Sequence, residues 1–154
     1  MTVISDFVSK FNTAVSLTED LLVKKNNRYF LLNDELRRLM KKDFFYAGLY
    51  LGKAKNETFF PSFNLLAMIA RADSNKMAVD SKTEWLFICG RDIFKQGITS
   101  ISKSRKKGDY TLVLDKHGEC LGFGKILHSI DQGERNKVIV KNIADIGDFL
   151  RRER

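Results

Sequence analysis

The sequence predicts an α+β protein in two parts, a first half of alternating helices and hairpins and a strand-rich second half. Apolar residues recur with helical spacing at the N-terminus, whereas the later strand-like runs are short and separated by turns that contain glycine. The chain has 154 residues, of which 44% are hydrophobic and 30% charged, enough for two small domains with apolar cores. From the change of pattern we assign residues 1–79 to an N-terminal α/β domain and 80–154 to a small β-barrel.

The first half is expected to run helix, hairpin, helix, hairpin, helix. Its first helix is predicted from apolar residues at helical spacing, namely Val3, Ile4, Phe7, Phe11, Ala14 and Val15. A tight hairpin over 21–33 is expected next, because Asn26 and Asn27 separate two strand-like runs and asparagine tolerates a positive φ. Asn33 is then the expected N-cap of a short helix.

The short helix has acidic residues in its first turn and basic residues in its last, which complements the helix dipole: Asp34, Glu35, Lys41 and Lys42. Its expected buried face consists of Leu36, Leu39 and Met40. A second hairpin is predicted over 44–63 with Lys55 and Asn56 in its turn, and Pro61 indicates an edge strand or the end of a strand. The third helix has two possible N-caps, Ser62 and Asn64.

The second half begins after a short strand, KMAVD. The apolar run TEWLFICG over 83–90 ends at a glycine, and residues 91–96 are expected to form one helical turn that Gly97 stops. Further strands are predicted from the runs ITSIS, YTLVLD, CLGFGKIL and VIVK. A final short helix is predicted from Ile143, Ile146, Phe149 and Leu150.

The net charge of +8 and the isoelectric point near 9.5 favour a polyanionic partner: nucleic acid, an acidic protein or an anionic membrane. Residues 1–79 carry 12 Lys/Arg and 8 Asp/Glu, and residues 80–154 carry 15 and 11, so each half has a surplus of four positive charges. Because no basic tail accounts for the charge, any basic patch must be assembled on the folded surface.

The cysteine content and the N-terminus indicate an intracellular protein. Cys89 and Cys120 are too few for a disulfide framework, and their apolar surroundings predict reduced, buried thiols. The N-terminus lacks the pattern of a secretory signal, and the longest purely apolar run, 65–70, is far shorter than a bilayer span. We therefore expect a cytoplasmic monomer, nucleolar if its source is a eukaryote, with no membrane partner.

The sequence shows no clear catalytic or metal site. His117 lies in a predicted turn and His128 ends a predicted strand, and neither has a serine or cysteine at a spacing typical of a nucleophile pair, which leaves only pairing in space. His117 and Cys120 are three residues apart, but the close cysteine pair of a structural zinc site is missing. The run GFGK at 122–125 resembles a phosphate-binding loop only in part. We expect no enzyme activity, no cofactor and no metal.

Basic residues are the remaining functional candidates. One group lies in a single loop: Lys103, Arg105, Lys106 and Lys107. Another closes the chain: Arg151, Arg152 and Arg154. Surface lysines are usually only solvated. The arginines follow an apolar segment that should anchor them, and guanidinium groups bind phosphate in a bidentate manner, so they are the better candidates for an RNA clamp.

Strings of the second half resemble a PUA domain, the pseudouridine synthase and archaeosine transglycosylase domain. FICGRDIFKQGITSI resembles its opening through Gly90, Ile93, Phe94, Gly97 and Ile98. YTLVLDKHGECLGFGKI resembles its central strands, with LGFG at 121–124 as their signature. The ending ADIGDFLR at 144–151 is similar to that of the Nip-seven-type large-subunit ribosome-biogenesis proteins. The first half matches that family through Gly48, Gly52 and Lys53.

The resemblance implies an N-terminal pre-PUA α/β domain packed on a PUA pseudo-barrel, and RNA binding without catalysis in ribosome biogenesis. It implies that RNA lies along the short helix after the first strand, its glycine turn and the C-terminal strand region. By position, the implied RNA-binding residues are Arg91, Lys95, Gln96, Gly97, Lys125, Lys141, Arg151, Arg152 and Arg154. Gly97 would let backbone amides approach the RNA. The implied partners are pre-rRNA, in single-stranded or structured U/A-rich regions, and other assembly proteins at the N-terminal domain.

Three alternatives stay open. Translation initiation factors of the density-regulated and malignant-T-cell-amplified type resemble this architecture, and PUA domains also accompany RNA-modifying enzymes, although the first half shows no catalytic aspartate motif. An adaptor protein could dock a partner through aromatic residues that otherwise belong to the core: Phe44, Phe45, Phe59 and Phe60. If RNA is the partner, replacing Arg151 and Arg152 by alanine should weaken its binding and leave the fold intact.

Overall fold

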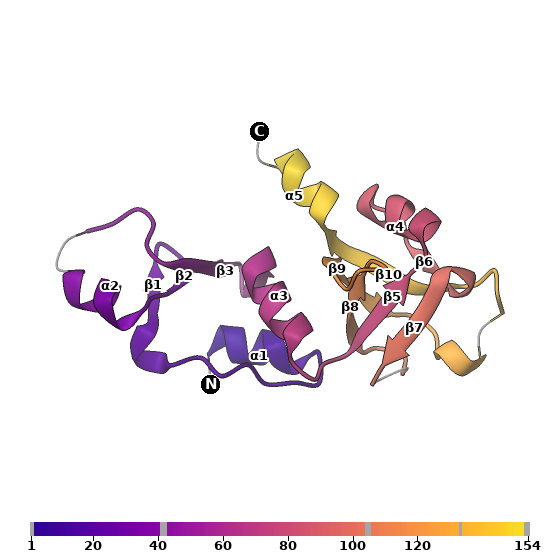
Figure 1. Ribbon diagram of the computed structural model, residues 1–154, viewed down its shortest axis with the longest axis horizontal. Coiled ribbons are helices and arrows are strands. Elements are labelled where there is room, and N and C mark those ends of the chain that lie inside the picture. The colour runs from indigo at the N-terminus through magenta and orange to yellow at the C-terminus, as the bar shows by residue number, and fades with distance from the viewer. Residues whose placement is uncertain (1, 41–42, 104–105, 133, 153–154) are drawn as a thin grey trace.

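The computed structural model describes residues 2–40, 43–103, 106–132 and 134–152 (Figure 1). Its strands form two sheets, and the helices α1 (Val3–Ser9) and α3 (Phe63–Arg71) lie between them. The first sheet is antiparallel, has the order β1-β2-β3-β4 and consists of β1 (Leu22–Lys25), β2 (Arg28–Leu31), β3 (Leu49–Lys55) and β4 (Thr58–Pro61).

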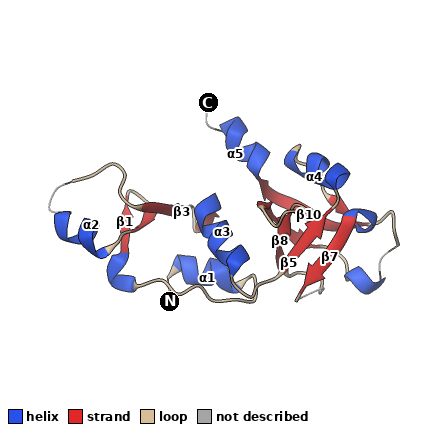
Figure 2. Cartoon of the chain, in the orientation of Figure 1, coloured by secondary structure: helices blue, strands red, loops and turns tan. Residues whose placement is uncertain are grey.

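The second sheet is mixed and curls into a half-barrel (Figure 2). Its order is β6-β10-β9-β8-β5-β7, and β5 is parallel to β8 whereas the other pairs are antiparallel. Its strands are β5 (Lys76–Val79), β6 (Ile93–Phe94), β7 (Ile98–Ser102), β8 (Tyr110–Leu114), β9 (Cys120–Ile126) and β10 (Val138–Asp145). β5, which the sequence analysis assigned to the first domain, thus pairs in the second sheet.

The remaining helices are short. They are α2 (Asp34–Leu39), α4 (Ser81–Ile88), α5 (Ile146–Arg152) and the 3₁₀ turns η1 (Glu19–Leu21), η2 (Lys95–Gly97) and η3 (Ile130–Gln132). Side chains accept hydrogen bonds from free backbone N–H groups at the helix starts, as Asn33 does for α2, Ser62 for α3 and Asp80 for α4. The hydrogen bond from the backbone of Thr83 also lowers the pKa of Asp80. The predicted caps Asn33 and Ser62 are confirmed.

Both hairpins of the first sheet turn through two residues with positive φ. Asn26 and Asn27 have φ of 48° and 62°, and Asn56 and Glu57 have the same values. Such turns match the twist of paired strands, and asparagine tolerates them better than most residues. The first hairpin is confirmed, whereas the second turns one residue later than predicted. Pro61 ends β4, an edge strand where no ladder hydrogen bond from its nitrogen is needed.

Two predictions for the first half were wrong. The first helix ends at Ser9, so Phe11, Ala14 and Val15 lie beyond it. Helix α2 ends at Leu39, and Leu39 is 78% exposed rather than buried, since so short a helix covers the sheet with Leu36 and Met40 only. Its last turn carries basic residues other than those expected, Arg37 and Arg38, and the predicted Lys41 and Lys42 lie outside the described residues.

The opening of the second half also differs from the prediction. The apolar run at 83–90 forms helix α4, which Asp80 caps and after which Gly90 takes a φ of 88°. Residues 91–96 form no helical turn of their own, because Ile93 and Phe94 pair with β10 and only 95–97 are 3₁₀. As the C-cap of α4, Cys89 is exposed, so the prediction that both thiols are buried is wrong for it.

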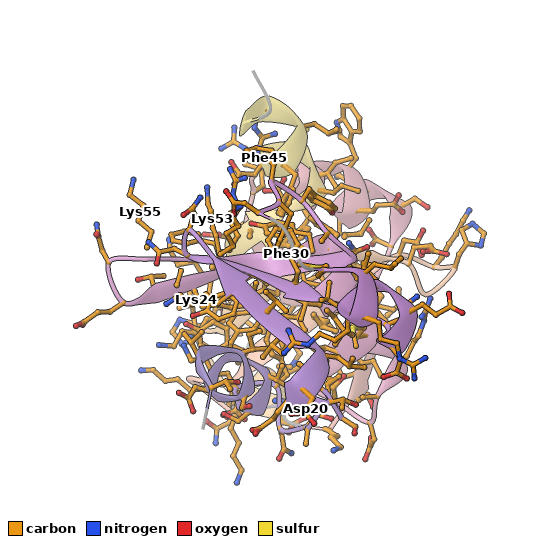
Figure 3. All side chains as sticks on the ribbon, turned by 90° about the vertical axis from the view of Figure 1, so that its left-hand side faces the viewer. Asp20, Lys24, Phe30, Phe45, Lys53 and Lys55 are labelled. Atoms are coloured by element: carbon orange, nitrogen blue, oxygen red, sulfur yellow. The ribbon has the colours of Figure 1, made fainter. Side chains whose placement is uncertain are left out.

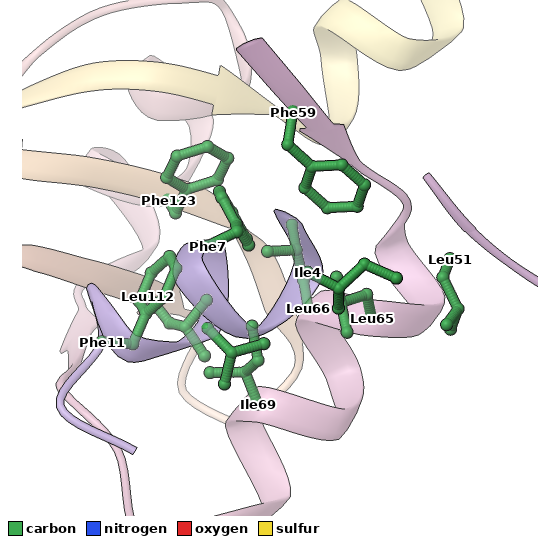
Figure 4. Packing of buried hydrophobic residues seen from close by; sticks show 11 residues of the cluster. Ile4, Phe7, Phe11, Leu51, Phe59, Leu65, Leu66, Ile69, Leu112 and Phe123 are labelled. Atoms are coloured by element: carbon green, nitrogen blue, oxygen red, sulfur yellow. The ribbon is translucent and has the colours of Figure 1, made fainter. Parts of the chain in front are cut away.

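The two sheets share one core through α1 and α3 (Figure 4). Phe7 of α1 contacts Phe59 of the first sheet and Phe123 of the second, with ring centroids 5.4 and 5.5 Å apart. Phe11 also packs on Phe123, at 5.7 Å. The other buried members of this shared core are Ile4, Val8, Leu51, Leu65, Leu66, Ile69 and Leu112. Rings from three elements therefore join the two halves into one packed unit.

Two further clusters stabilise each half by itself. Inside the half-barrel, Phe87 of α4 packs on buried strand residues that include Met77, Val113 and Ile139. In the first sheet, Phe30 is fully buried beneath the segment before β3, which supplies Ala47. Phe87 is the buried side chain of α4 and anchors this helix on the half-barrel.

Replacing Phe123 by alanine should lower the free energy of unfolding by about 3–5 kcal/mol, the usual loss for a large ring in a packed core. Because the shared core joins both halves, urea denaturation should remain a single transition in the intact protein. Leu150→Ala, at a side chain 69% exposed, is the control and should change stability by less than about 0.5 kcal/mol. Two separate transitions in the intact protein would contradict the shared core.

Candidate nucleic-acid interface

Hydrogen bonds to Asn142 of β10 fix the end of α4 and the turn after it. The side-chain amide of Asn142 donates to the carbonyl of Phe87 at 2.9 Å and to that of Arg91 at 3.4 Å. A third bond, of 3.2 Å, joins it to the carboxylate of Asp145. The backbone N–H of Asn142 donates to the Asp92 carboxylate at 2.9 Å. One strand residue thus sets the path of the chain on both sides of the turn.

The buried carboxylate of Asp145 anchors α5. It accepts a hydrogen bond from the backbone N–H of Asp148 at 2.8 Å and lies 3.4 Å from the guanidinium group of Arg151. Arg151 also donates to the carbonyl of Ile88 at 3.2 Å. Ile88 is the last residue of α4, where carbonyls lack helical partners and a cation is favourable. Arg151 therefore holds α5 on the end of α4, while 53% of its side chain stays exposed.

A glycine allows this close contact between the helices. A Cβ atom on Gly147 would lie 2.0 Å from the carbonyl oxygen of Ile88, closer than real atoms approach. Any larger residue would push α5 away from α4. The glycine in the string DIGD, which carried part of the resemblance, therefore has a packing role.

Exposed groups gather where α4 ends, and we call this surface the α4–α5 corner. It comprises Trp85, Cys89, Gly90, Arg91 and Arg151. Trp85 is 65% exposed and lies one helical turn before Ile88 and Cys89, so it shares their side of α4. The corner thus combines an accessible indole with two guanidinium groups.

Sequence analysis missed Trp85. The run around it was interpreted only as apolar. One signal could have revealed it: Asp80 and Ser81, followed by Glu84, resemble a capping box and place a helix start just before the run. On a helix that buries Phe87, the ring of Trp85 two positions earlier must point elsewhere.

The predicted site residues around η2 lie away from the corner. Arg91 belongs to the corner, but the backbone N–H groups of Lys95 and Gln96 bond to carbonyls of 137 and 135. Gln96 lines a pocket of about 250 Å³ with Leu86, Phe94 and Arg135. Gly97 is buried, and a Cβ atom there would lie 2.0 Å from the hydroxyl of Thr83. Thr83 of α4 therefore fills the space beside Gly97, which corrects the expectation that this glycine lets RNA approach the backbone.

Lys125 and Lys141 form a second group on another face. They are directly opposite each other on β9 and β10, and Tyr110 of β8 continues the row. Neighbouring Asn142 faces α4, and successive strand residues point to opposite faces, so Lys141 points away from the corner. The structure therefore does not unite the predicted residues in one cluster.

The remaining predicted cations are only partly described. The backbone of Arg152 ends α5, but its side chain is outside the described residues, as are Arg154 and Arg105 of the basic loop. Lys103, with φ of 64°, donates to the carbonyls of Asn12 and Asp73 and forms an ion pair with the Asp73 carboxylate at 3.0 Å. Lys103 thus ties its loop to the first half.

Within residues 2–152, apart from the undescribed gaps, no group of three His, Cys, Asp or Glu side chains is arranged to hold a metal ion. No helix in the same residues is long and apolar enough to cross a membrane. His117 is exposed in the turn between β8 and β9, and His128 follows β9. Cys120 is largely buried, which raises the pKa of its thiol to about 11.

The profile of the UPF0113 PUA domain family matches residues 75–154, which contain both helices of the corner. This chain belongs to that family. A UPF0113 protein from Archaeoglobus fulgidus is 30% identical over 114 residues, covering 71% of this chain but only 63% of that protein's length. This UPF0113 protein thus spans less than two thirds of that relative's length.

Solved structures confirm the predicted fold. A conserved PUA domain protein from Thermoplasma acidophilum superposes with a TM-score of 0.61 at 20% identity, covering 97% of this chain and 91% of its own. A hypothetical protein from Pyrococcus horikoshii gives 0.53 at 17% identity, covering 83% and 77%. An α+β architecture with a C-terminal PUA domain is therefore established for this UPF0113 protein.

The two thiols should differ strongly in reactivity. Because the thiolate is the nucleophile, Cys120, with its burial and its raised pKa, should react with iodoacetamide far more slowly at pH 8 than exposed Cys89. Mass spectrometry of digested, time-resolved samples would measure both rates. Faster alkylation of Cys120 than of Cys89 in the folded protein would contradict the placement of Cys89 at the corner.

Proposed function

We propose that this UPF0113 protein binds RNA through the α4–α5 corner and catalyses no reaction on it. The observation that carries the proposal is the exposed ring of Trp85 in the last turn of α4, the helix whose end Arg151 contacts and Arg91 follows. Bases of single-stranded RNA stack on aromatic rings, and guanidinium groups bind the phosphates between them. The net charge of +8 supports a polyanionic partner.

The resemblance to PUA domains supports the same surface once the short helix that it implies is identified as α4. It implied RNA along the short helix after the first PUA strand, and in the structure the helix after β5 is α4. The glycine turn is then Gly90, whose left-handed φ of 88° turns the chain directly into Arg91. The proposed site therefore moves from residues 95–97 toward Trp85 and Gly90.

Arg151 has two roles in this proposal. Its contacts with Asp145 and Ile88 orient the guanidinium group, so that its exposed edge can bind a phosphate with little loss of side-chain entropy. Removing it would also loosen α5. The double change of Arg151 and Arg152 to alanine is therefore a poor test, because it would affect the packing of α5 together with the proposed RNA contact.

The biological setting we propose is assembly of the large ribosomal subunit, with pre-rRNA as the RNA. The ADIGDFLR ending, similar to that of Nip-seven-type proteins, supports it. In a eukaryotic source the protein would then be nucleolar as well as cytoplasmic. Co-sedimentation of the tagged protein with large-subunit precursors is expected, whereas co-sedimentation with initiating small subunits would favour an initiation factor instead.

Replacing Trp85 and Arg91 together by alanine should weaken binding to a short oligouridylate by about tenfold or more, since one stacked base alone contributes about 1–3 kcal/mol. The slope of log affinity against log salt should also fall by about 0.7, for one lost phosphate contact. Fluorescence anisotropy over a range of salt concentrations measures both quantities.

The matched control for that variant is Lys116→Ala with Leu39→Ala. It removes one cation from the turn between β8 and β9 and one exposed apolar side chain from α2, and neither residue belongs to the corner. Both variants should unfold at the same urea concentration as the intact protein. If both lose affinity equally, the corner is not the site; if the intact protein binds no RNA at low salt, the proposed function is wrong.

A further inference from the structure

Three cations lie side by side across the first sheet. Lys25 of β1 is directly opposite Arg28 of β2, Arg28 is opposite Lys53 of β3, and Lys53 is opposite Phe60 of β4. Residues paired in this way point to the same face of a sheet. Like charges directly opposite each other destabilise a sheet, so this row is an arrangement that folding alone does not favour.

Two of the three cations lack an acidic partner. Lys25 forms an ion pair with the Asp43 carboxylate, whose pKa its hydrogen bond lowers, and it also donates to the carbonyl of Phe44. Arg28 lies over the ring of Phe45, 5.1 Å from its centroid. Neither Arg28 nor Lys53 forms an ion pair with any residue that the structure describes. Their charges are therefore available to an external anion.

The surrounding sequence reinforces the positive charge. Residues 22–60 carry nine Lys/Arg and four Asp/Glu, a surplus of five, whereas the whole of 1–79 has a surplus of four. The positive charge of the first half is thus concentrated in the sheet and its connections. Charge complementarity points to a polyanion as the partner of this face.

Open aromatic rings accompany the cations. Phe45 is 78% exposed, Tyr46 is 57% exposed and Phe60 is 37% exposed. Of the four phenylalanines considered for docking, only Phe59 is fully in the core and Phe44 is half-buried. An acidic peptide needs only the cations, whereas a single-stranded nucleic acid uses rings for its bases and cations for its phosphates. The combination favours RNA.

The same face continues onto the PUA domain. A pocket of about 230 Å³ is lined by Tyr50, Lys53 and Phe60 from the first sheet and by Asp148 and Phe149 from α5. Phe149 also packs edge-on against Phe63 of α3, with centroids 4.7 Å apart, which fixes α5 beside the sheet. Asp148 also lies one helical turn before Arg151 on α5, and it links this pocket to the α4–α5 corner.

We propose that this sheet face, made of Arg28, Phe45, Lys53 and Phe60, is a second RNA-contact surface. A single-stranded RNA held at the α4–α5 corner continues over α5 and onto it. The proposal rests on the proposed function, because it extends the same RNA beyond the PUA domain. It also assigns the exposed aromatic residues of the first half to RNA rather than to a protein partner.

The opposite face of the same sheet provides a control. Lys24 is opposite Tyr29, one position out of step with the row of cations, and lies 5.7 Å from the centre of the Tyr29 ring. Figure 3 shows Lys53 and Phe45 on the upper side of the sheet and Lys24 on its lower side. A change at Lys24 therefore removes the same charge from the same sheet without touching the proposed surface.

The test compares Arg28→Gln with Lys53→Gln against the matched control Lys24→Gln with Lys116→Gln, which has the same net charge. Binding is measured to oligouridylates of about 20 and about 6 nucleotides, since one small domain covers about 4–16. The first variant should lose on the order of tenfold in affinity for the long RNA, and its salt slope should fall by about 1.4 for two phosphates. Affinity for the short RNA should not change.

Other outcomes separate this inference from the proposed function. If both charge variants bind the long RNA equally well, the sheet face is not a contact surface, although loss of binding in the Trp85 and Arg91 variant would still support the corner. If the intact protein binds neither RNA, both proposals fail. Phe45→Leu should also weaken binding of the long RNA. If this variant binds the long RNA as tightly as the intact protein does, and polyglutamate competes for the sheet face as well as RNA does, the partner of this face is an acidic protein and not RNA.

Discussion

The contact of Phe7 and Phe11 with Phe123 is the interaction on which the rest of the structure depends. It places a helix from the start of the chain against a strand of the half-barrel, and it brings Phe59 of the first sheet into the same core. Neither sheet covers its own inner face fully. Because each half completes the core of the other, the first sheet has a fixed position relative to α5, and a surface shared by both halves becomes possible.

A polar network makes the corresponding connection at the α4–α5 corner. Asp145 is buried and Asn142 is half-buried, and their hydrogen-bonding groups are satisfied by α4, the following turn and α5. Such groups are costly to bury unless every partner is in place. Their arrangement leaves Arg151 oriented and half-exposed at the surface. Rigidity inside and open cationic and aromatic groups outside are what a preorganised RNA site requires.

Local signals in the sequence predicted much of the fold. The Asn26-Asn27 turn and the caps Asn33 and Ser62 depend only on neighbouring residues, and the structure has them where expected. Helix α4 was missed because an eight-residue helix with one buried ring looks like any short apolar run. The errors at Cys89 and Gly97 and the oversight of Trp85 all follow from it. The pairing of Phe7 with Phe123 spans most of the chain, and no local pattern reveals such a contact.

The central claim is that one RNA surface extends from the α4–α5 corner across α5 to the first sheet. Ultraviolet crosslinking of the intact protein to a long single-stranded RNA, followed by mass spectrometry of the peptides, tests it most directly. The account predicts crosslinks at Trp85 and at Phe45 or Tyr46 in the same complex. Crosslinks confined to the face of Lys125 and Lys141, or absent from both aromatic sites, would contradict it.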